Sequence, residues 1–182
     1  MSFNPPQLGR RMAWIGALTA STILGSFVFA CATPFAALAA LAALFLPRRD
    51  ALALMIFNWL ANQVIGYGFL HYPQTWDSFA WGGAIGLGAL AALPAAWWAE
   101  GLARPIGWFA SAVSAFIAAF VGYEIILYAA ATVLPAGDGF SASVILYVLE
   151  VNGAGFAGLL VLQALGQMTG IALSRPAALA PA

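Results

Sequence analysis

Two glutamates lie in the middle of long apolar stretches of this sequence. Glu124 has Tyr128 one helical turn after it. Glu150 has Tyr147 one turn before it, and Asn152 follows closely. An ionisable side chain inside a bilayer costs roughly 3 kcal/mol on insertion scales, so it is expected to face other helices rather than lipid. Carboxylates held in this way bind cations, protons or polar ligands, and we expect both glutamates to line a binding site.

A third apolar stretch carries hydrogen-bonding side chains: Asn62, Gln63, Tyr67 and His71. Amides between membrane helices either line a polar cavity or join the helices by hydrogen bonds worth about 1 kcal/mol each. We expect Asn62, Gln63 and Tyr67 to line a cavity with the glutamates. His71 is either a ligand or a residue of the membrane interface. The joining role is expected of three further amides: Asn58, Gln163 and Gln167.

The composition is that of a membrane protein. Of the 182 residues, 64% are hydrophobic and 7% are charged, and the mean hydropathy is +0.95. A soluble domain carries about a quarter charged residues, which is far more than this chain has for a water-facing surface. The arginines are scattered and there is no lysine, so no basic patch indicates nucleic-acid binding. We expect a single all-α integral membrane domain over residues 1–182.

Clusters of Pro, Gly and charged residues divide the chain into six apolar segments. They are residues 11–31, 34–47, 51–71, 79–98, 106–134 and 141–173. Five reach the roughly 20 residues that a bilayer crossing requires, and the second must be short, tilted or extended into its loop. The N-terminus resembles the start of a signal peptide, but the run after it is long enough to span, so we expect a retained first helix. Six transmembrane helices are therefore predicted.

The arginines fix the direction of these helices. With six spans they all fall on one face: Arg10, Arg11, Arg48, Arg49, Arg104 and Arg175. The positive-inside rule makes that face cytoplasmic and puts both termini inside, in a bacterial-type cytoplasmic membrane. Glu124 and Glu150 then both lie roughly 14 Å below the outer helix ends. The predicted site is a polar cavity in the outer half, lined by the third, fifth and sixth helices.

Two parts of the sequence resemble a known family. They are the stretch TPFAALAALAALFLPRRDALALMIFNWLANQVIGYG, residues 33–68, and the pair Ala13-x-x-x-Ala17. The first is similar to the second and third helices of the S-components of energy-coupling factor transporters. The pair is similar to the motif by which their first helix contacts a transmembrane coupling subunit. These S-components are six-helix subunits that bind vitamins and related micronutrients.

The resemblance implies that the outer-half cavity binds a vitamin and that a coupling module of a transmembrane subunit and ATPases is the partner. The chain has no G-x-x-x-x-G-K-[ST] phosphate loop, so ATP hydrolysis would belong to that partner, or transport would proceed without it. No intrinsic cofactor is expected. The resemblance also offers cobalamin as the best candidate substrate, because some S-components bind it and ligate its cobalt through a cysteine. Cys31 or His71 could serve as that ligand. Thiamine or another cationic ligand would suit the glutamates better.

Two other functions stay open. A small secondary transporter for a metal cation or a proton-coupled solute would use Glu124, Glu150 and His71 as its ion path, although no inverted repeat is visible. A non-transporting accessory subunit would use small-residue faces such as GGAIGLGALAAL for docking. An enzyme is not expected, because the sequence has no H-E-x-x-H, no G-x-S-x-G and no obvious nucleophile–base pair.

Overall fold

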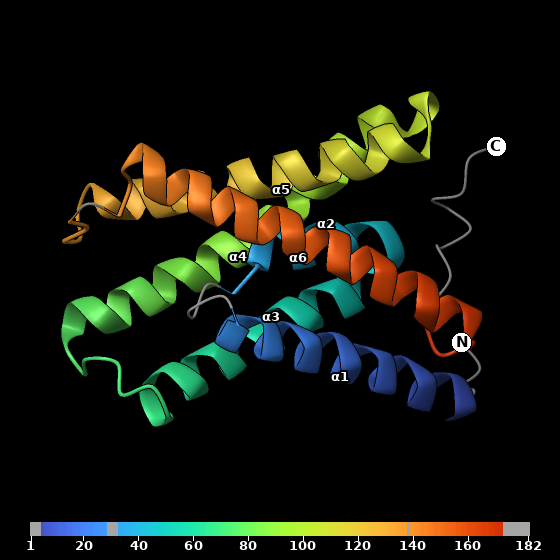
Figure 1. Cartoon of the computed structure of the whole chain (residues 1–182), viewed down its shortest axis with the longest axis horizontal. Helices are drawn as coiled ribbons and strands as arrows, with labels where there is room; N and C mark the ends of the chain where they lie inside the picture. The colour runs from blue at the N-terminus through green and yellow to red at the C-terminus, as the bar shows by residue number, and fades with distance from the viewer. Residues whose placement is uncertain (1–4, 29–32, 138, 173–182) are drawn as a thin grey trace.

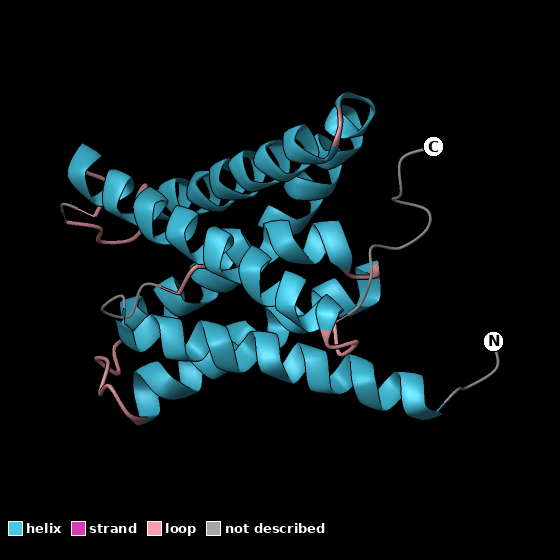
Figure 2. Ribbon diagram, turned by 45° about the vertical axis from the view of Figure 1, so that its right-hand side comes forward, coloured by secondary structure: helices cyan, strands magenta, loops and turns pink. Residues whose placement is uncertain are grey.

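The protein is built of helices. The computed structural model describes residues 5–28, 33–137 and 139–172 (Figure 1). Within these ranges there are α-helices and one 3₁₀ turn but no strand (Figure 2). The elements are α1 (Pro5–Val28), α2 (Phe35–Phe45), α3 (Arg48–Gly68), α4 (Trp76–Ala103), η1 (Arg104–Ile106), α5 (Trp108–Ala131) and α6 (Ala142–Met168). Each α-helix falls on one of the predicted apolar segments, so the all-helical fold class is confirmed.

Three helices extend into charged residues that the sequence predicts to lie outside them. α1 begins at Pro5 rather than at residue 11 and so includes Arg10. α3 begins at Arg48 rather than residue 51, and α4 runs from Trp76 to Ala103 rather than over 79–98. These charges are accepted in or beside helices because they have partners close by. The partners are Asp50 with Arg11, Glu100 with Arg104 at 2.6 Å, and Arg48 at 5.2 Å from the centre of the Trp97 ring.

Three helical segments of the described chain are long and apolar enough to cross a membrane. They are Trp76–Ile106, Trp108–Ala131 and Ala142–Met168, of 31, 24 and 27 residues. α1 and α3 have 24 and 21 residues but carry more polar and charged side chains. α2 has 11 residues, and its rise of about 16 Å is half of a hydrocarbon core of roughly 30 Å. These segments are those of a helical membrane protein, and crossing by all six helices stays a prediction.

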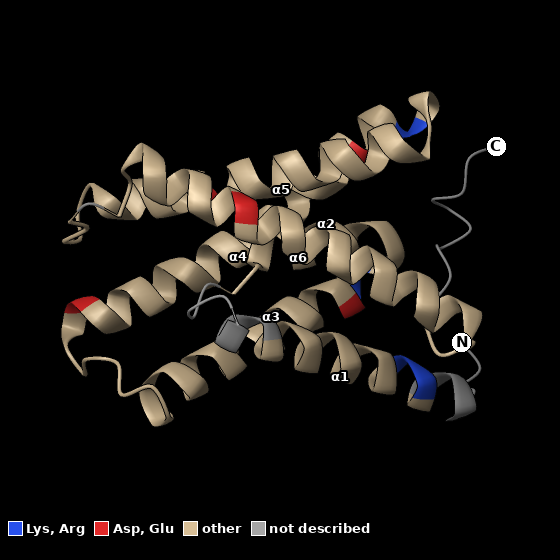
Figure 3. Cartoon of the chain, in the orientation of Figure 1, with Lys and Arg blue, Asp and Glu red and all other residues tan. Residues whose placement is uncertain are grey.

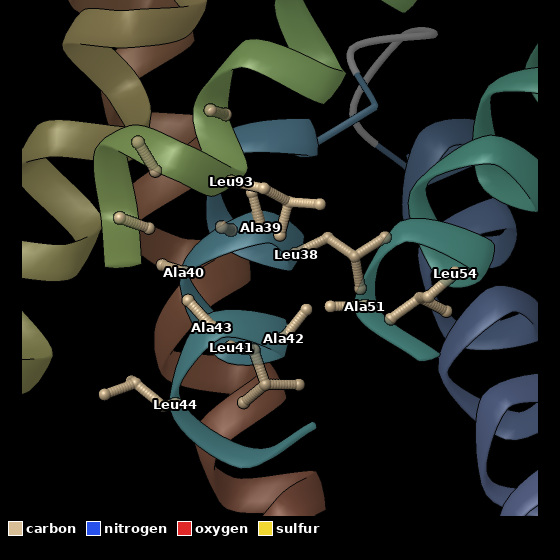
Figure 4. Close-up of a cluster of buried hydrophobic side chains, with 14 of the residues drawn as sticks. Leu38, Ala39, Ala40, Leu41, Ala42, Ala43, Leu44, Ala51, Leu54 and Leu93 are labelled. Atoms are coloured by element: carbon tan, nitrogen blue, oxygen red, sulfur yellow. The ribbon is translucent and has the colours of Figure 1, made fainter. Parts of the chain in front are cut away.

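α2 is the centre of the fold. All 11 of its residues are buried, with none more than 8% exposed, and α3, α4, α5 and α6 pack around it. In Figure 4, Leu38 of α2 points toward Ala51 and Leu54 of α3, and Leu93 of α4 lies next to Ala39. The sequence FAALAALAALF has no polar face, which is typical of a helix enclosed by protein on all sides. Its alanines let the neighbouring backbones approach closely.

The arginines gather at one end of the molecule. In Figure 1, α1 begins and α6 ends at the right-hand end, and α2 begins near the middle. Figure 3 shows the arginines of the described residues toward that same end. The loops that join α3 to α4 and α5 to α6 lie at the opposite, left-hand end. We call the right-hand end the arginine end and the left-hand end the loop end.

Polar side chains join α1 to its neighbours. Asn58 of α3 is 2% exposed and accepts a hydrogen bond from the Thr22 hydroxyl, while its Nδ2 donates to the Thr19 hydroxyl at 3.2 Å. Gln163 of α6 is 1% exposed and accepts a hydrogen bond from the Trp14 indole at 3.1 Å. Asn58 and Gln163 therefore have the joining role that the sequence predicts. Gln167 is exposed on the last turn of α6.

A tryptophan of α3 packs against glycines of α4. The Trp59 indole Nε1 donates a hydrogen bond to the Gly82 carbonyl at 2.8 Å. A methyl group at Gly86 would lie 2.7 Å from atoms of the Trp59 ring, and one at Gly82 would lie 2.3 Å from Gln63 Oε1. This part of the small-residue face of α4 is therefore used inside the chain, and it holds α3 and α4 together.

Candidate binding site

A cavity of about 190 Å³ lies among the start of α2 and the helices α3, α4, α5 and α6. It reaches toward the loop end, because Tyr72 and Phe140 come from the loops there. A cavity in this half is what the sequence predicts, with α2 and α4 as additional walls. The lining residues are Thr33, Phe35, Asn62, Tyr72, Ile85, Tyr123, Glu124, Leu127, Gly139, Phe140, Val148 and Asn152.

The first turn of α2 lies at the cavity and is capped by α6. Asn152 Oδ1 accepts hydrogen bonds from the backbone N–H groups of Ala36 at 3.1 Å and Ala37 at 3.2 Å, and its Nδ2 donates to the Val148 carbonyl at 2.9 Å. The N-terminal N–H groups of a helix have no partner within the helix, so a side-chain acceptor there is stabilising. Asn152 is 2% exposed, and its amide is already engaged by the protein. Its main role is to hold α2 in place.

A chain of amides forms the wall that α3 contributes. Asn62 Nδ2 donates to the Thr33 hydroxyl at 2.8 Å, and Gln63 Nε2 donates to Asn62 Oδ1 at 3.1 Å. Asn62 lines the cavity, whereas Gln63 lies behind it against Gly82. Gln63 therefore orients Asn62. Asn62 can still bind a ligand, because Nδ2 has a second hydrogen to donate and Oδ1 can accept a second hydrogen bond.

α5 contributes two consecutive polar residues to the cavity. Tyr123 is 7% exposed, and its ring packs on Phe35, the first residue of α2, with ring centres 6.2 Å apart. Glu124 is partly buried beside it. In the described part of the chain, neither the Tyr123 hydroxyl nor the Glu124 carboxylate has a hydrogen-bond or ion-pair partner. Among the described residues that line the cavity, Glu124 is the one that carries a charge.

Glu150 does not join Glu124 in this cavity, which corrects the expected pairing. Glu150 and Tyr147 are exposed on α6. Successive helical residues are rotated by about 100°, so Glu150 lies roughly 200° from Asn152 around the helix axis. Because Asn152 faces α2, Glu150 faces away from the protein. Tyr128 is also 64% exposed, and it contacts Phe140 in an edge-to-face arrangement with ring centres 5.7 Å apart.

The end of α3 places its tyrosine and histidine outside the cavity. Tyr67 stacks on Phe79 with ring centres 4.7 Å apart, and its hydroxyl lies 3.2 Å from that of Ser78. His71 is exposed in the loop after α3, with a φ of 55°. The next residue, Tyr72, lines the cavity in its place. Among the described residues there is no group of three or more His, Cys, Asp or Glu side chains that could hold a metal ion.

The remaining predicted site residues lie on or near α1. Ala13 and Ala17 are exposed, while Trp14, Ile15 and Leu18 on the same helix are buried. The exposed pair is therefore accessible to another protein. Cys31, the other suggested cobalt ligand, lies outside the described residues.

Sequence reasoning missed Phe35 and Tyr123 as cavity residues. The position of Tyr123 directly before Glu124 was the sequence signal that could have identified it as a cavity residue. Phe35 begins α2, as the predicted segment 34–47 suggests, but its place at the cavity depends on how α2 packs in the fold, which an apolar sequence does not show. Comparisons with protein-family models, with curated proteins and with solved structures find no match for this chain. Function is therefore inferred from the cavity and its lining.

Proposed function

We propose that this chain is a membrane-embedded binding protein for the uptake of a vitamin or related micronutrient. Its six helices would lie in a cytoplasmic membrane with the arginine end inside and the loop end outside. The one-sided arginines and the three long apolar helical segments support this orientation.

The observation that carries the proposal is the 190 Å³ cavity, in which Tyr123 and Glu124 have no hydrogen-bond or ion-pair partner among the described residues. An ionisable group inside a membrane domain is expensive and marks a functional site by default. Glu124 is such a group, and the neighbouring Tyr123 hydroxyl could hydrogen-bond a ligand. The remaining lining is largely apolar and aromatic, as in small-molecule sites generally.

The closest functional description is that of an S-component of an energy-coupling factor transporter. Besides the sequence resemblance, the exposed Ala13 and Ala17 support it, because small residues on an open helix face permit close docking of another helix. The coupling subunit and its ATPases would then supply the energy.

The size of the cavity favours a ligand smaller than a corrinoid. Its 190 Å³ lies below the roughly 300–1,000 Å³ of pockets for drug-sized molecules. Cobalamin stays a candidate that would require the outer helix ends to separate. His71, outside the cavity, would then need to move toward it.

The experiment uses protein purified in mild detergent from cells fed a vitamin mixture. Mass spectrometry of the released small molecules identifies the ligand, and equilibrium dialysis measures its saturable binding. Two tryptophan substitutions on α4 form a matched pair, because Ile85 lines the cavity and Leu87 is 65% exposed. We expect Ile85→Trp to lower the affinity at least tenfold and Leu87→Trp to leave it unchanged.

Two outcomes would overturn the proposal. One is the absence of saturable binding for every vitamin offered, and the other is unchanged binding by Ile85→Trp. Asn62→Leu is a second cavity variant for the case in which Ile85→Trp does not fold.

A second candidate is a cation-coupled secondary transporter, which is favoured by Glu124, a carboxylate that has no partner within the described part of the chain. Uptake into proteoliposomes with and without an imposed proton or sodium gradient separates the two. If the protein is a cation-coupled transporter, we expect Glu124→Gln to abolish gradient-driven uptake. An accessory subunit would show neither binding nor uptake.

A further inference from the structure

Glu124 lies between two hollows. Besides the cavity, it lines an open groove of about 430 Å³ along α5. Phe140, from the loop before α6, is the other residue that both hollows share. A ligand that reaches Glu124 can therefore extend into either hollow.

The groove is apolar apart from two residues. Among the described residues that line it, Glu124 and Tyr128 carry the polar groups, and the others include Phe120, Ile125 and Ile145. Ile125 is 59% exposed, so this face of α5 is open. In a membrane the groove would offer an apolar surface continuous with the acyl chains.

We propose that the site takes a small organic cation with an apolar body. The charged head pairs with Glu124 at the cavity, and the body lies in the groove along α5. This inference rests on the proposed function, since it names the chemical class of the solute that the cavity binds.

Charge and geometry favour a cation over an anion or a neutral ligand. The carboxylate has no partner in the described residues, and a cation would offset its desolvation. The rings of Tyr72, Tyr123 and Phe140 line the same cavity, and aromatic faces attract cationic heads within about 6 Å. The N–H groups of Ala36 and Ala37 at the first turn of α2 do not serve an anion, because Asn152 already accepts them.

The test compares three probes with alkyl chains of similar length. They are hexyltrimethylammonium, the uncharged N-hexylacetamide and the anion heptanoate. Each is dialysed against the full chain in nanodiscs of zwitterionic lipid, and binding to empty nanodiscs is subtracted. We expect saturable binding of the cation only.

Two carboxylates give a matched pair of variants for this test. Glu124→Gln should weaken binding of hexyltrimethylammonium by about tenfold or more, as when one member of a desolvated charge pair is removed. Glu150→Gln, on the exposed side of α6, should leave it unchanged. The thermal midpoints of both variants check that they fold.

The groove is tested by chain length. Affinity should rise from tetramethylammonium to hexyltrimethylammonium, by up to about fourfold for each methylene that leaves water. Ala129 also lines the groove and is exposed, so Ala129→Phe fills it without disturbing the core. This variant should remove most of the gain with chain length.

The inference is overturned if Glu124→Gln binds the cation as tightly as the unaltered protein. Equal binding of N-hexylacetamide would overturn it too, as would an unchanged chain-length gain in Ala129→Phe. If a neutral or anionic vitamin binds instead, the proposed function stands and this inference fails. If neither a vitamin nor a probe binds saturably, both fail.

Discussion

Asn152 Oδ1 accepts the backbone N–H of Ala36 at 3.1 Å, and so ties the middle of α6 to the first turn of α2. The same oxygen accepts the N–H of Ala37. A helix that begins inside a membrane domain cannot turn to water for these bonds, and an unsatisfied backbone group there costs several kcal/mol. A side chain from a distant part of the chain meets that need.

Asn152→Ala is expected to lower the free energy of unfolding by about 1–3 kcal/mol, because it leaves two buried N–H groups without an acceptor. Denaturant unfolding in mild detergent measures the change. Asn152→Asp keeps acceptor oxygens at the helix N-terminus, where negative charge is favourable, and should lose less. Equal losses in both variants would contradict the capping role.

Tyr123→Phe should separate binding from stability. The hydroxyl has no partner in the described residues, so its removal should leave the free energy of unfolding within about 0.5 kcal/mol. If the hydroxyl contacts the ligand, affinity should fall by about threefold to tenfold, the worth of one hydrogen bond. Tyr147→Phe is the control for binding, because Tyr147 is exposed on α6 and is not among the residues that line the cavity or the groove. A large loss of stability in Tyr123→Phe would point to a structural bond instead.

Two neighbouring glycines of α4 should respond oppositely to alanine. Gly86→Ala puts a methyl group 2.7 Å from the Trp59 ring, so the indole must shift and its bond to the Gly82 carbonyl weakens. Overpacking of this kind costs about 1–3 kcal/mol. Gly83 has no atom within 4 Å of an added methyl, so Gly83→Ala should be neutral or stabilising by up to about 1 kcal/mol. Unfolding followed by tryptophan fluorescence compares them, and similar losses in both would be inconsistent with the packing described.

Glu150→Leu is expected to stabilise the isolated protein in a bilayer. The carboxylate is exposed on a helix apolar enough to span, and replacing it with leucine removes a desolvation cost of up to roughly 3 kcal/mol. A rise in the thermal midpoint in nanodiscs would agree with this. A fall would mean that Glu150 makes a favourable interaction in the folded protein.

The positions of the helices could be predicted from the sequence. Pro, Gly and charge clusters interrupt the apolar runs, and the α-helices begin and end within a few residues of these breaks. The common depth of Glu124 and Glu150 rests on helical rise and stays a prediction, because α5 ends at Ala131 rather than at residue 134. Such positions along a helix axis depend only on the spacing of residues in the sequence.

The rotation of each helix about its axis could not be predicted. α6 is apolar on all sides, so nothing in its pattern distinguishes the face of Asn152 from that of Glu150. The buried face is chosen by contact with α2, which is distant in sequence. The same reason explains why Tyr123 escaped notice and why the exposed Tyr128 and Tyr147 were expected in the cavity.

The hydrogen bonds from α2 to α6 also bear on the order in which the helices assemble during synthesis. Chains are synthesised from the N-terminus, and α2, at 11 residues, is made long before Asn152 emerges. Until then its first turn lacks its acceptor, and it is too short to settle across a bilayer alone. We therefore expect the insertion machinery to shelter this segment while four further helices are translated. α2 is thus among the first helices to be synthesised, but its first turn gains its hydrogen-bond acceptor only when the last helix, α6, packs against it.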